Sequence, residues 1–140
     1  MSRKAWVPPN AANKYLHVVY AAEDKHGLPR NLLARLLYQE SRYRDDIISG
    51  QVKSAAGAVG IAQIVPRWHP NVDPLDVDAA IFYAAGYLSR LYSKYGDWER
   101  ALAAYNWGPG NVDKHGISGD RLPTETKNYF TQILNDVRVS

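Results

Sequence analysis

Residues 76–96 read DVDAAIFYAAGYLSRLYSKYG. Apolar side chains recur there at alternating intervals of three and four positions, which is the repeat of one face of an α-helix. Gly96 follows the last apolar position and suits the left-handed residue that ends many helices. This stretch therefore predicts a long amphipathic helix over about Asp76–Tyr95.

The rest of the chain repeats this helical pattern, and no segment shows the alternation of a half-buried strand. Asn10 can cap the first helix and Gly27 can end it, while Asp97 can cap the helix that follows the long one. The sequence predicts about six helices around one core, which is an all-α fold. Besides the long helix they lie at 10–26, from 29 through 40, at 60–65, at 97–106 and from 124 onward, with loops at 49–58, 68–73 and 111–123.

The chain of 140 residues has the size of one domain, with 46% hydrophobic and 22% charged residues. We predict a single domain over residues 1–140, in which 1–9 form a short N-terminal extension. The absence of cysteine excludes disulfides, thiolate catalysis and cysteine-ligated zinc. The four histidines are far apart, and the sequence has no His-Glu-x-x-His pair, P-loop or dinucleotide-binding glycine motif. We therefore expect neither a metal nor a cofactor.

The formal net charge of +3 suits an anionic partner such as nucleic acid, a membrane surface or a cell-wall polymer, or it simply aids solubility. No basic block and no motif that reads RNA or DNA occurs, so we expect no nucleic-acid partner. No apolar run approaches the roughly 20 residues of a membrane span. The basic start, MSRKAWVPP, lacks the apolar core of a signal peptide, so we expect no signal and no membrane segment.

Glu40 has an unusual position, because it continues the apolar stripe of its helix, three positions after Leu37 and seven after Leu33. A buried carboxylate is costly unless it is paired or functional. In a functional interpretation, burial raises its pKa and keeps a proton available for a glycosidic oxygen. In a structural interpretation, Arg44 lies four residues further on and forms an ordinary helix ion pair with it. Position alone leaves both open.

Four other polar residues also have a functional and a structural interpretation. Ser41 can orient the acid or bond to the local backbone, and Gln63 can bind sugar hydroxyls or tie a loop to the core. Tyr105 lies on an apolar stripe, but it ends its helix where a hydroxyl can reach the acid or the substrate. Glu125 suits the first turn of a helix, where acidic side chains are favourable. None of the four is informative alone.

Four motifs occur in one order along the chain: Glu40-Ser41, GIAQ at 60–63 followed by IVP, AYNWGPG at 104–110 and PTETKNY at 123–129. This order resembles the soluble lytic transglycosylase catalytic domain, a lysozyme-like family, over residues 12–137. The resemblance implies an α-helical lysozyme-like fold with a cleft that binds glycan strands. Four ordered motifs are far more specific than a lone Glu-Ser pair.

The resemblance also implies roles for individual residues. Glu40 matches the family's single catalytic acid/base. The residues that match substrate-contacting positions are Ser41, Gln63, Val65, Tyr105, Asn106, Glu125 and Tyr129. The chain departs from the family pattern at Ala62 and Val65, where Met is usual, at Lys127 in place of a frequent Arg, and at Trp107 in place of a small residue. Trp107 can add a stacking surface or block a subsite, so these departures bear on substrate preference rather than on the acid.

The implied reaction breaks the β-1,4 bond between MurNAc and GlcNAc in peptidoglycan without water and leaves 1,6-anhydro-MurNAc ends. Glu40 protonates the bond oxygen, the N-acetyl group of MurNAc stabilises the oxocarbenium-like centre, and Glu40 then takes the proton of the C6 hydroxyl as it attacks C1. Such substrate-assisted catalysis needs no second carboxylate. The alternatives are a goose-type lysozyme-like hydrolase on the same fold, an inactive glycan-binding module and a nucleic-acid binder.

The small size and the lack of a recognisable signal or anchor suggest a phage protein that degrades the bacterial wall. It would be an endolysin, held in the host cytoplasm until its release to the periplasm and cell wall, or a virion component used at entry. A bacterial origin stays open. We expect a monomer whose partner is the glycan strands of peptidoglycan.

Overall fold

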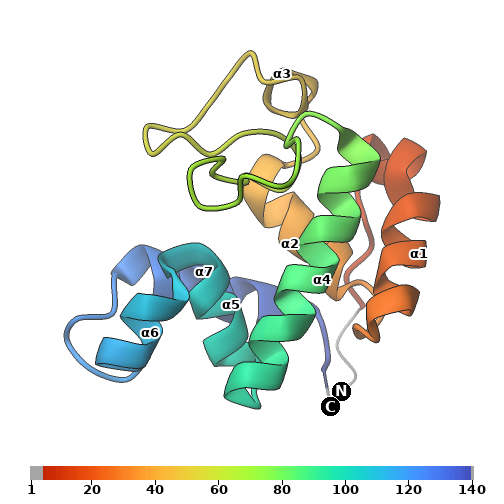
Figure 1. Ribbon diagram of the computed structural model, residues 1–140. Coiled ribbons are helices and arrows are strands. Elements are labelled where there is room, and N and C mark those ends of the chain that lie inside the picture. Colours follow the sequence, from red (N-terminus) through yellow and green to blue (C-terminus); the bar gives the residue numbers. More distant parts are fainter. Residues whose placement is uncertain (1–4, 140) are drawn as a thin grey trace.

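The computed structural model describes residues 5–139, and in that range all secondary structure is helical apart from one isolated antiparallel bridge between Val59 and Ile64. The prediction of an all-α fold is confirmed. The first four residues of the predicted N-terminal extension lie outside the described range. In chain order the elements are the 3-10 helix η1 (Asn10–Tyr15) and the α-helices α1 (Leu16–His26), α2 (Leu32–Ser41), α3 (Asp45–Ile48), α4 (Val77–Tyr95), α5 (Trp98–Trp107), α6 (Pro109–His115) and α7 (Thr124–Asp136) (Figure 1).

Helix α4 begins and ends where the sequence predicts. The side chain of Asp76 accepts a hydrogen bond from the backbone N–H of Ala79 at 3.2 Å, which satisfies one of the free donors of the first turn. Gly96 ends the helix with a positive φ of 78°. Asp97 caps α5 in the same way, by accepting from the backbone N–H of Arg100 at 2.7 Å. These local signals fix the two helices that meet most closely in the core.

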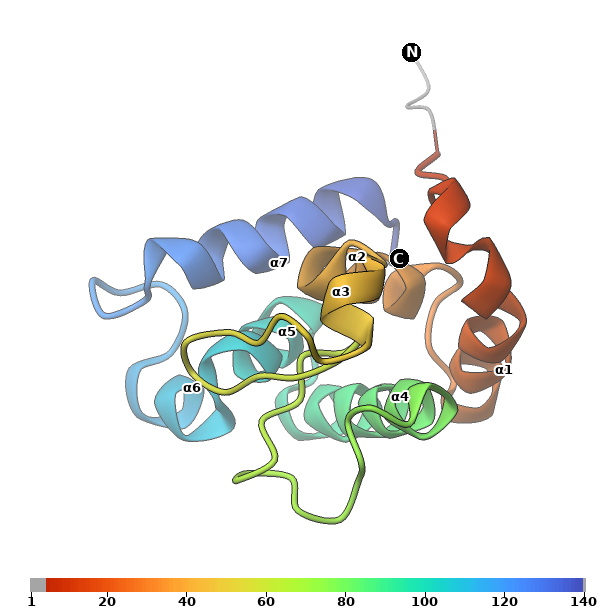
Figure 2. The same ribbon diagram turned by 90° about the horizontal axis from the view of Figure 1, so that it is seen from above.

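The helices enclose one hydrophobic core. Helix α4 packs against α1 and α5, α5 packs in turn against α6 and α7, and α2 contacts α1 and α7 (Figures 1 and 2). Burial of each large apolar side chain contributes about 1.5–3 kcal/mol. The core includes Val19, Leu32, Leu33, Leu36, Leu37, Ile61, Ile81, Leu88, Leu102 and Ile133, all essentially inaccessible to solvent. None of the helices in residues 5–139 is long and apolar enough to cross a membrane.

The predicted short helix at residues 60–65 is wrong. Gly60 and Gln63 have positive φ values of 83° and 50°, which a right-handed helix does not accommodate. The backbone amides of Val59 and Ile64 instead donate to each other's carbonyl oxygens at 2.9 and 3.1 Å, which closes a tight loop. A Cβ atom at Gly60 would overlap the carbonyl oxygen of Pro74. This position therefore requires glycine, for its conformation and for the close approach of the two backbones.

Other boundaries differ from the predictions for local reasons. Asn10 is the first residue of η1 rather than its cap. Helix α2 begins at Leu32 instead of near Pro29, because Asn31 has a positive φ of 73°. The Gly-Pro-Gly sequence does end α5, but Pro109 also starts α6, which the sequence prediction missed. Proline suits the first turn of a helix, where its missing N–H has no partner to lose.

Candidate active site

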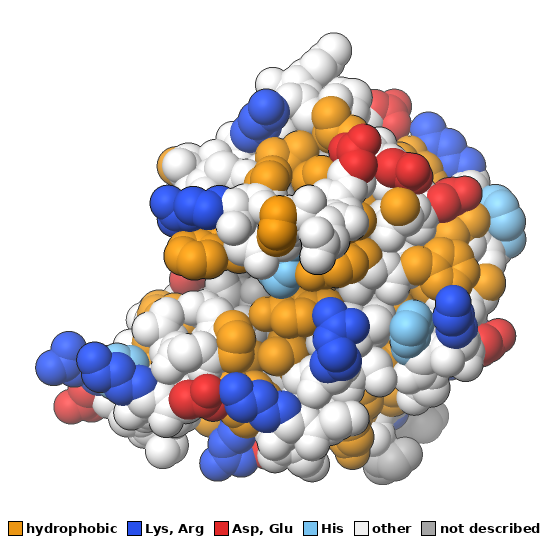
Figure 3. Space-filling view, in the orientation of Figure 1, with side chains coloured by type: hydrophobic (Ala, Val, Ile, Leu, Met, Phe, Trp, Pro, Cys, Tyr) orange, Lys and Arg blue, Asp and Glu red, His pale blue; other side chains and the backbone are white. Residues whose placement is uncertain are grey.

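A cleft of about 670 Å³ opens between the loops that follow α3 and the ends of α2, α5 and α7. Figure 3 shows the molecule hollowed between the lobe of these loops and the lobe of α5 and α6, with hydrophobic side chains along the hollow. The residues that line the cleft are Gln39, Glu40, Ser54, Ala56, Ala58, Gln63, Val65, Tyr105, Asn106, Glu125, Asn128 and Tyr129. All four motifs of the sequence thus contribute to one surface.

Glu40 lies in this cleft, one residue before the end of α2, and is half-buried. The hydroxyl of Tyr129, on α7, donates a hydrogen bond to its Oε2 atom at 2.7 Å. Burial raises the pKa of Glu40 to about 8; the hydrogen bond from Tyr129 opposes this rise, and the nearby carboxylate of Glu125 adds to it. The side chain therefore retains its proton at neutral pH, as a general acid requires.

The ion pair between Glu40 and Arg44, which was the structural interpretation of Glu40, is absent. Helix α2 ends at Ser41, and Arg42 follows with a positive φ of 55°, so Arg44 is no longer on the same helical face. The guanidinium of Arg44 instead binds the carboxylate of Asp46 in a bidentate contact at 3.1 and 2.7 Å. This contact leaves the acid without a basic partner from its own helix.

Ser41 does not line the cleft, which corrects the prediction that it contacts substrate. Its side chain is fully buried. Its hydroxyl donates to the Leu37 carbonyl oxygen at 3.1 Å and accepts from the backbone N–H of Tyr43 at 3.3 Å. Ser41 thus ends the helix that carries Glu40, which was the structural interpretation of this residue.

The tight loop at 59–64 places Gln63 and Val65 in the cleft. The side-chain amide of Gln63 donates to the Gly60 carbonyl oxygen at 2.9 Å, which fixes its orientation and leaves its oxygen as an acceptor for a ligand. Tyr105 lines the cleft from α5, and its hydroxyl donates to the Ala62 carbonyl oxygen at 2.9 Å. That bond ties the loop to α5, so Tyr105 positions the loop rather than the acid.

The C-terminal end of α5 and the first turn of α7 complete the cleft. Asn106 accepts a hydrogen bond at its Oδ1 atom from the hydroxyl of Thr126 at 2.8 Å, so its amide nitrogen remains a donor for substrate. Glu125 is exposed at the cleft margin. Trp107 does not line the cleft; its ring stacks on that of His115 with centroids 5.7 Å apart. The structure therefore brings together six of the seven predicted substrate contacts, without Ser41.

Five residues of the cleft were missed in the sequence. Asn128 lies one turn from Glu125 on α7, so helical spacing could have identified it. Gln39 precedes the acid, but nothing in the sequence shows that it points into a cleft. The remaining three, Ser54, Ala56 and Ala58, belong to a loop whose course no local pattern predicts. Residues 5–139 contain no group of acidic or histidine side chains that could hold a metal ion.

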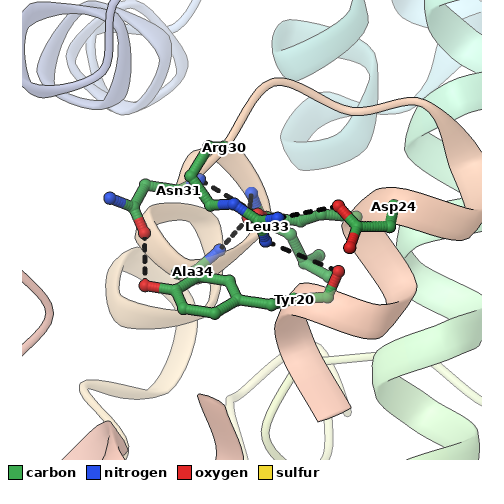
Figure 4. Close-up of polar contacts among 7 residues, drawn as sticks. Tyr20, Asp24, Arg30, Asn31, Leu33 and Ala34 are labelled. Carbon is green, nitrogen blue, oxygen red and sulfur yellow. Dashed lines mark hydrogen bonds and ion pairs between the residues drawn. The ribbon is translucent and has the colours of Figure 1, made fainter. Parts of the chain in front are cut away.

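A second carboxyl group, that of Glu23 on α1, positions the start of the helix that carries the acid. It is fully buried and accepts from the backbone N–H groups of Asn31 at 3.0 Å, Leu33 at 3.0 Å and Ala34 at 3.2 Å. Arg30 also donates to it at 3.1 Å, and Figure 4 shows this network around the start of α2. Burial raises the pKa of Glu23, while these amides and Arg30 oppose the rise. No sequence pattern pointed to this residue.

Known proteins are similar to this chain in sequence and in fold. Residues 17–127 match the family model described as the Transglycosylase SLT domain. The chain belongs to the transglycosylase SLT domain family. The predicted resemblance is thus confirmed, and with it the lysozyme-like form of the all-α fold.

Curated relatives of this SLT domain carry names of the same kind. It is 32% identical to membrane-bound lytic murein transglycosylase D of Escherichia coli (strain K12), a match that covers 88% of this chain and 30% of the relative. It is 29% identical to membrane-bound lytic murein transglycosylase F of Nitrosospira multiformis, over 74% of this chain and 23% of the relative. The SLT domain therefore spans less than a third of the length of these relatives.

Two solved structures have the same fold. The 70 kDa soluble lytic transglycosylase of Escherichia coli matches with a TM-score of 0.67 and 26% identity, over 86% of this chain and 23% of that one. The lytic transglycosylase Slt of Pseudomonas aeruginosa, solved as an inactive mutant, matches with a TM-score of 0.60 and 23% identity, over 89% of this chain and 25% of that one. The similarity covers nearly all of the SLT domain.

Proposed function

We propose that this SLT domain is a peptidoglycan lytic transglycosylase with Glu40 as its catalytic acid and base. The observation that carries the proposal is a half-buried carboxyl group in a cleft, held by Tyr129 at 2.7 Å, with its pKa raised to about 8. Two relatives named lytic murein transglycosylases support the proposed substrate class. We assign the activity to one domain over residues 1–140, with 1–9 as an N-terminal extension.

The proposed reaction uses one carboxyl group twice, first as an acid and then as a base. Glu40 donates its proton to the glycosidic oxygen, the bond between that oxygen and C1 of MurNAc breaks, and the N-acetyl group stabilises the positive centre. The carboxylate then takes the proton from the C6 hydroxyl while its oxygen attacks C1, which forms the 1,6-anhydro ring and consumes no water. Because Tyr129 occupies Oε2, we assign both proton transfers to Oε1. One positioned group of this kind contributes about 10²–10⁴ in rate.

Six residues are proposed to bind the sugars around the reacting bond. Gln63 and Asn106 each keep a free amide atom in the cleft, which suits N-acetyl and hydroxyl groups. Val65 offers an apolar contact for an acetyl methyl group. The other proposed contacts are Tyr105, Glu125 and Tyr129.

The chemical nature of the product tests this proposal against its nearest rival. Digestion of purified sacculi is expected to release fragments with 1,6-anhydro-MurNAc ends, which mass spectrometry distinguishes by the missing water. Reducing MurNAc ends alone would instead indicate a goose-type lysozyme-like hydrolase. Strand binding without any fragments would indicate an inactive glycan-binding module.

Tyr129→Phe is expected to shift the pH dependence of the reaction upward. Its hydroxyl lowers the pKa of Glu40, so its removal raises that pKa above 8, and the fall in rate at alkaline pH moves up by about one pH unit. The rate at neutral pH falls as well, because the acid loses its positioning contact. The measurement is the rate of sacculus solubilisation between pH 5 and 10.

Tyr105→Phe is the matched control for this prediction. It removes a hydroxyl that lies in the same cleft but donates to Ala62 rather than to the acid. Its alkaline limb is expected to stay near pH 8, whatever its rate. If the rates of the two variants fell at the same alkaline pH, the assigned role of Tyr129 would be contradicted.

The biological setting is a separate part of the proposal. We propose that the domain acts as a monomer on glycan strands. An endolysin or virion role in a phage stays a prediction, and the curated relatives named above are bacterial enzymes called membrane-bound. Detection of the protein in purified virions would support the virion role, and its presence only in lysates would favour an endolysin.

A further inference from the structure

A row of aromatic rings leads away from the cleft along α4. Tyr105, which lines the cleft, packs on Tyr87 with ring centroids 5.7 Å apart. Tyr87 contacts His69 at 4.8 Å, and His69 contacts Tyr83 at 5.3 Å. All four rings are partly exposed. They form a continuous row of ring contacts that leads from the cleft to the surface around His69 and Tyr83.

A turn from Val65 to His69 joins the cleft to the aromatic row. Val65 lines the cleft, and its carbonyl oxygen accepts from the backbone N–H groups of Trp68 at 3.0 Å and His69 at 3.1 Å. The bond from Trp68 to Val65 closes a β-turn, so the Cα atoms of these two residues lie within about 7 Å of each other. The His69 ring nitrogen Nδ1 and the Tyr83 hydroxyl are 2.6 Å apart. The turn is therefore fixed both at the cleft and on α4.

This turn presents an exposed tryptophan with a cation above it. Trp68 is 66% exposed, and the guanidinium of Arg67 lies 4.6 Å from the centre of its ring. A large exposed aromatic on a fixed backbone is typical of a binding anchor, because little conformational freedom is lost when a partner covers it. The Trp–Arg pair offers a flat apolar face and a planar cation at one place.

We propose that Arg67 and Trp68 form an outer subsite for the same glycan strand whose reacting bond lies at Glu40. The inference rests on the proposed function, because the strand must first occupy the cleft. The indole ring stacks on a sugar face, and the guanidinium pairs with carboxylates of the peptide stems that the strand carries. The ring contacts run from Tyr105 in the cleft to His69, the residue that follows Trp68.

Binding to the Glu40→Gln chain tests the subsite without cleavage. Calorimetry is carried out with long soluble glycan strands that carry stem peptides and with a tetrasaccharide short enough to occupy only the cleft. Trp68→Ala in this background is expected to weaken binding of the long strands about tenfold and to leave the tetrasaccharide unchanged. Trp68→Phe retains a ring and is expected to restore most of the affinity. Arg67→Ala is expected to weaken only strands that still carry their peptides.

Tyr92→Ala is the matched control, since Tyr92 is 38% exposed and stacks on Trp98 outside the aromatic row. It is expected to leave every affinity unchanged. Equal affinity of the Trp68→Ala and parent chains for long strands would overturn the subsite. So would a loss of affinity for the tetrasaccharide as large as that for the long strands. A parent chain that binds no long strand would overturn it as well. Failure of the proposed function is read separately, from the products that the wild-type chain releases from sacculi.

Discussion

Glu40→Gln is expected to lower the rate of peptidoglycan cleavage by about 10²–10⁴ while the fold stays intact. Glutamine has nearly the same shape as glutamate, and its carbonyl oxygen can still accept the hydrogen bond from Tyr129. Its amide group is far too weak an acid to transfer a proton to the glycosidic oxygen. The measurement is the rate at which purified sacculi are solubilised, with the release of anhydro ends followed by mass spectrometry.

The stability of the same variant shows whether the acid is protonated as proposed. The pKa of Glu40 rises from 4.5 to about 8 on folding, so between these values the folded chain holds a proton that the unfolded chain has lost. The contribution of the Glu40 side chain to the free energy of unfolding is fully present below pH 4.5 and is lost as the pH rises to 8. Glu40→Gln has no such dependence, so it should become the more stable chain at pH 8, by at most about 5 kcal/mol.

Two outcomes would contradict these expectations. Activity of Glu40→Gln within a few-fold of the wild type would show that another group supplies the proton, or that the chain has a different function. Parallel stability profiles of the two chains between pH 4.5 and 8 would show that the carboxyl group is already ionised in the folded state. Thermal unfolding followed by circular dichroism at several pH values gives the comparison.

Glu23→Ala is expected to destabilise the chain by about 3–5 kcal/mol, a large part of the stability of a domain of this size. The substitution leaves the buried N–H groups of Leu33 and Ala34 without an acceptor and removes a side chain that fills the junction of α1 and α2. The expected fall in the melting temperature is roughly 10–20 °C. Denaturant unfolding and thermal melts measure both quantities.

Asp24→Ala is the matched control, because Asp24 pairs with the same Arg30 at 2.8 Å but has a side chain that is 68% exposed. An exposed ion pair contributes less than about 1 kcal/mol, so this variant should melt within a few degrees of the wild type. Equal losses for the two variants would show that Arg30, and not the buried amides, accounts for the effect of Glu23.

The sequence predicted the elements whose signals are local. Helix α4 shows the apolar repeat together with both of its caps, Asp76 and Gly96, so both ends were predicted closely. Residues 60–65 were wrongly predicted as a short helix, because the apolar residues there resemble a helical turn. The real form of this segment depends on the contact between Gly60 and the backbone of Pro74, fourteen residues away. Helix α6 was missed because the proline that starts it was interpreted only as a break.

The candidate site was predicted through the order of four motifs rather than through any single residue. Gln63, Tyr105 and Tyr129 lie far apart in sequence, and only the fold brings their side chains to Glu40 or to the loop beside it. Ser41 was wrongly predicted to contact substrate, because a motif shows that a residue belongs to a site but not which way it points. Glu23 gave no signal, since its partners are backbone amides that any sequence offers.

Helix α2 has a polarity that acts on the chemistry at its far end. Its aligned peptide dipoles place partial positive charge at the end that Glu23 contacts and partial negative charge at the end that carries Glu40. A carboxylate is disfavoured at the negative end, and a cation is favoured there, by about 0.3–1 kcal/mol. One short helix would therefore resist ionisation of the acid before a sugar arrives and then favour the cationic sugar carbon as its bond breaks.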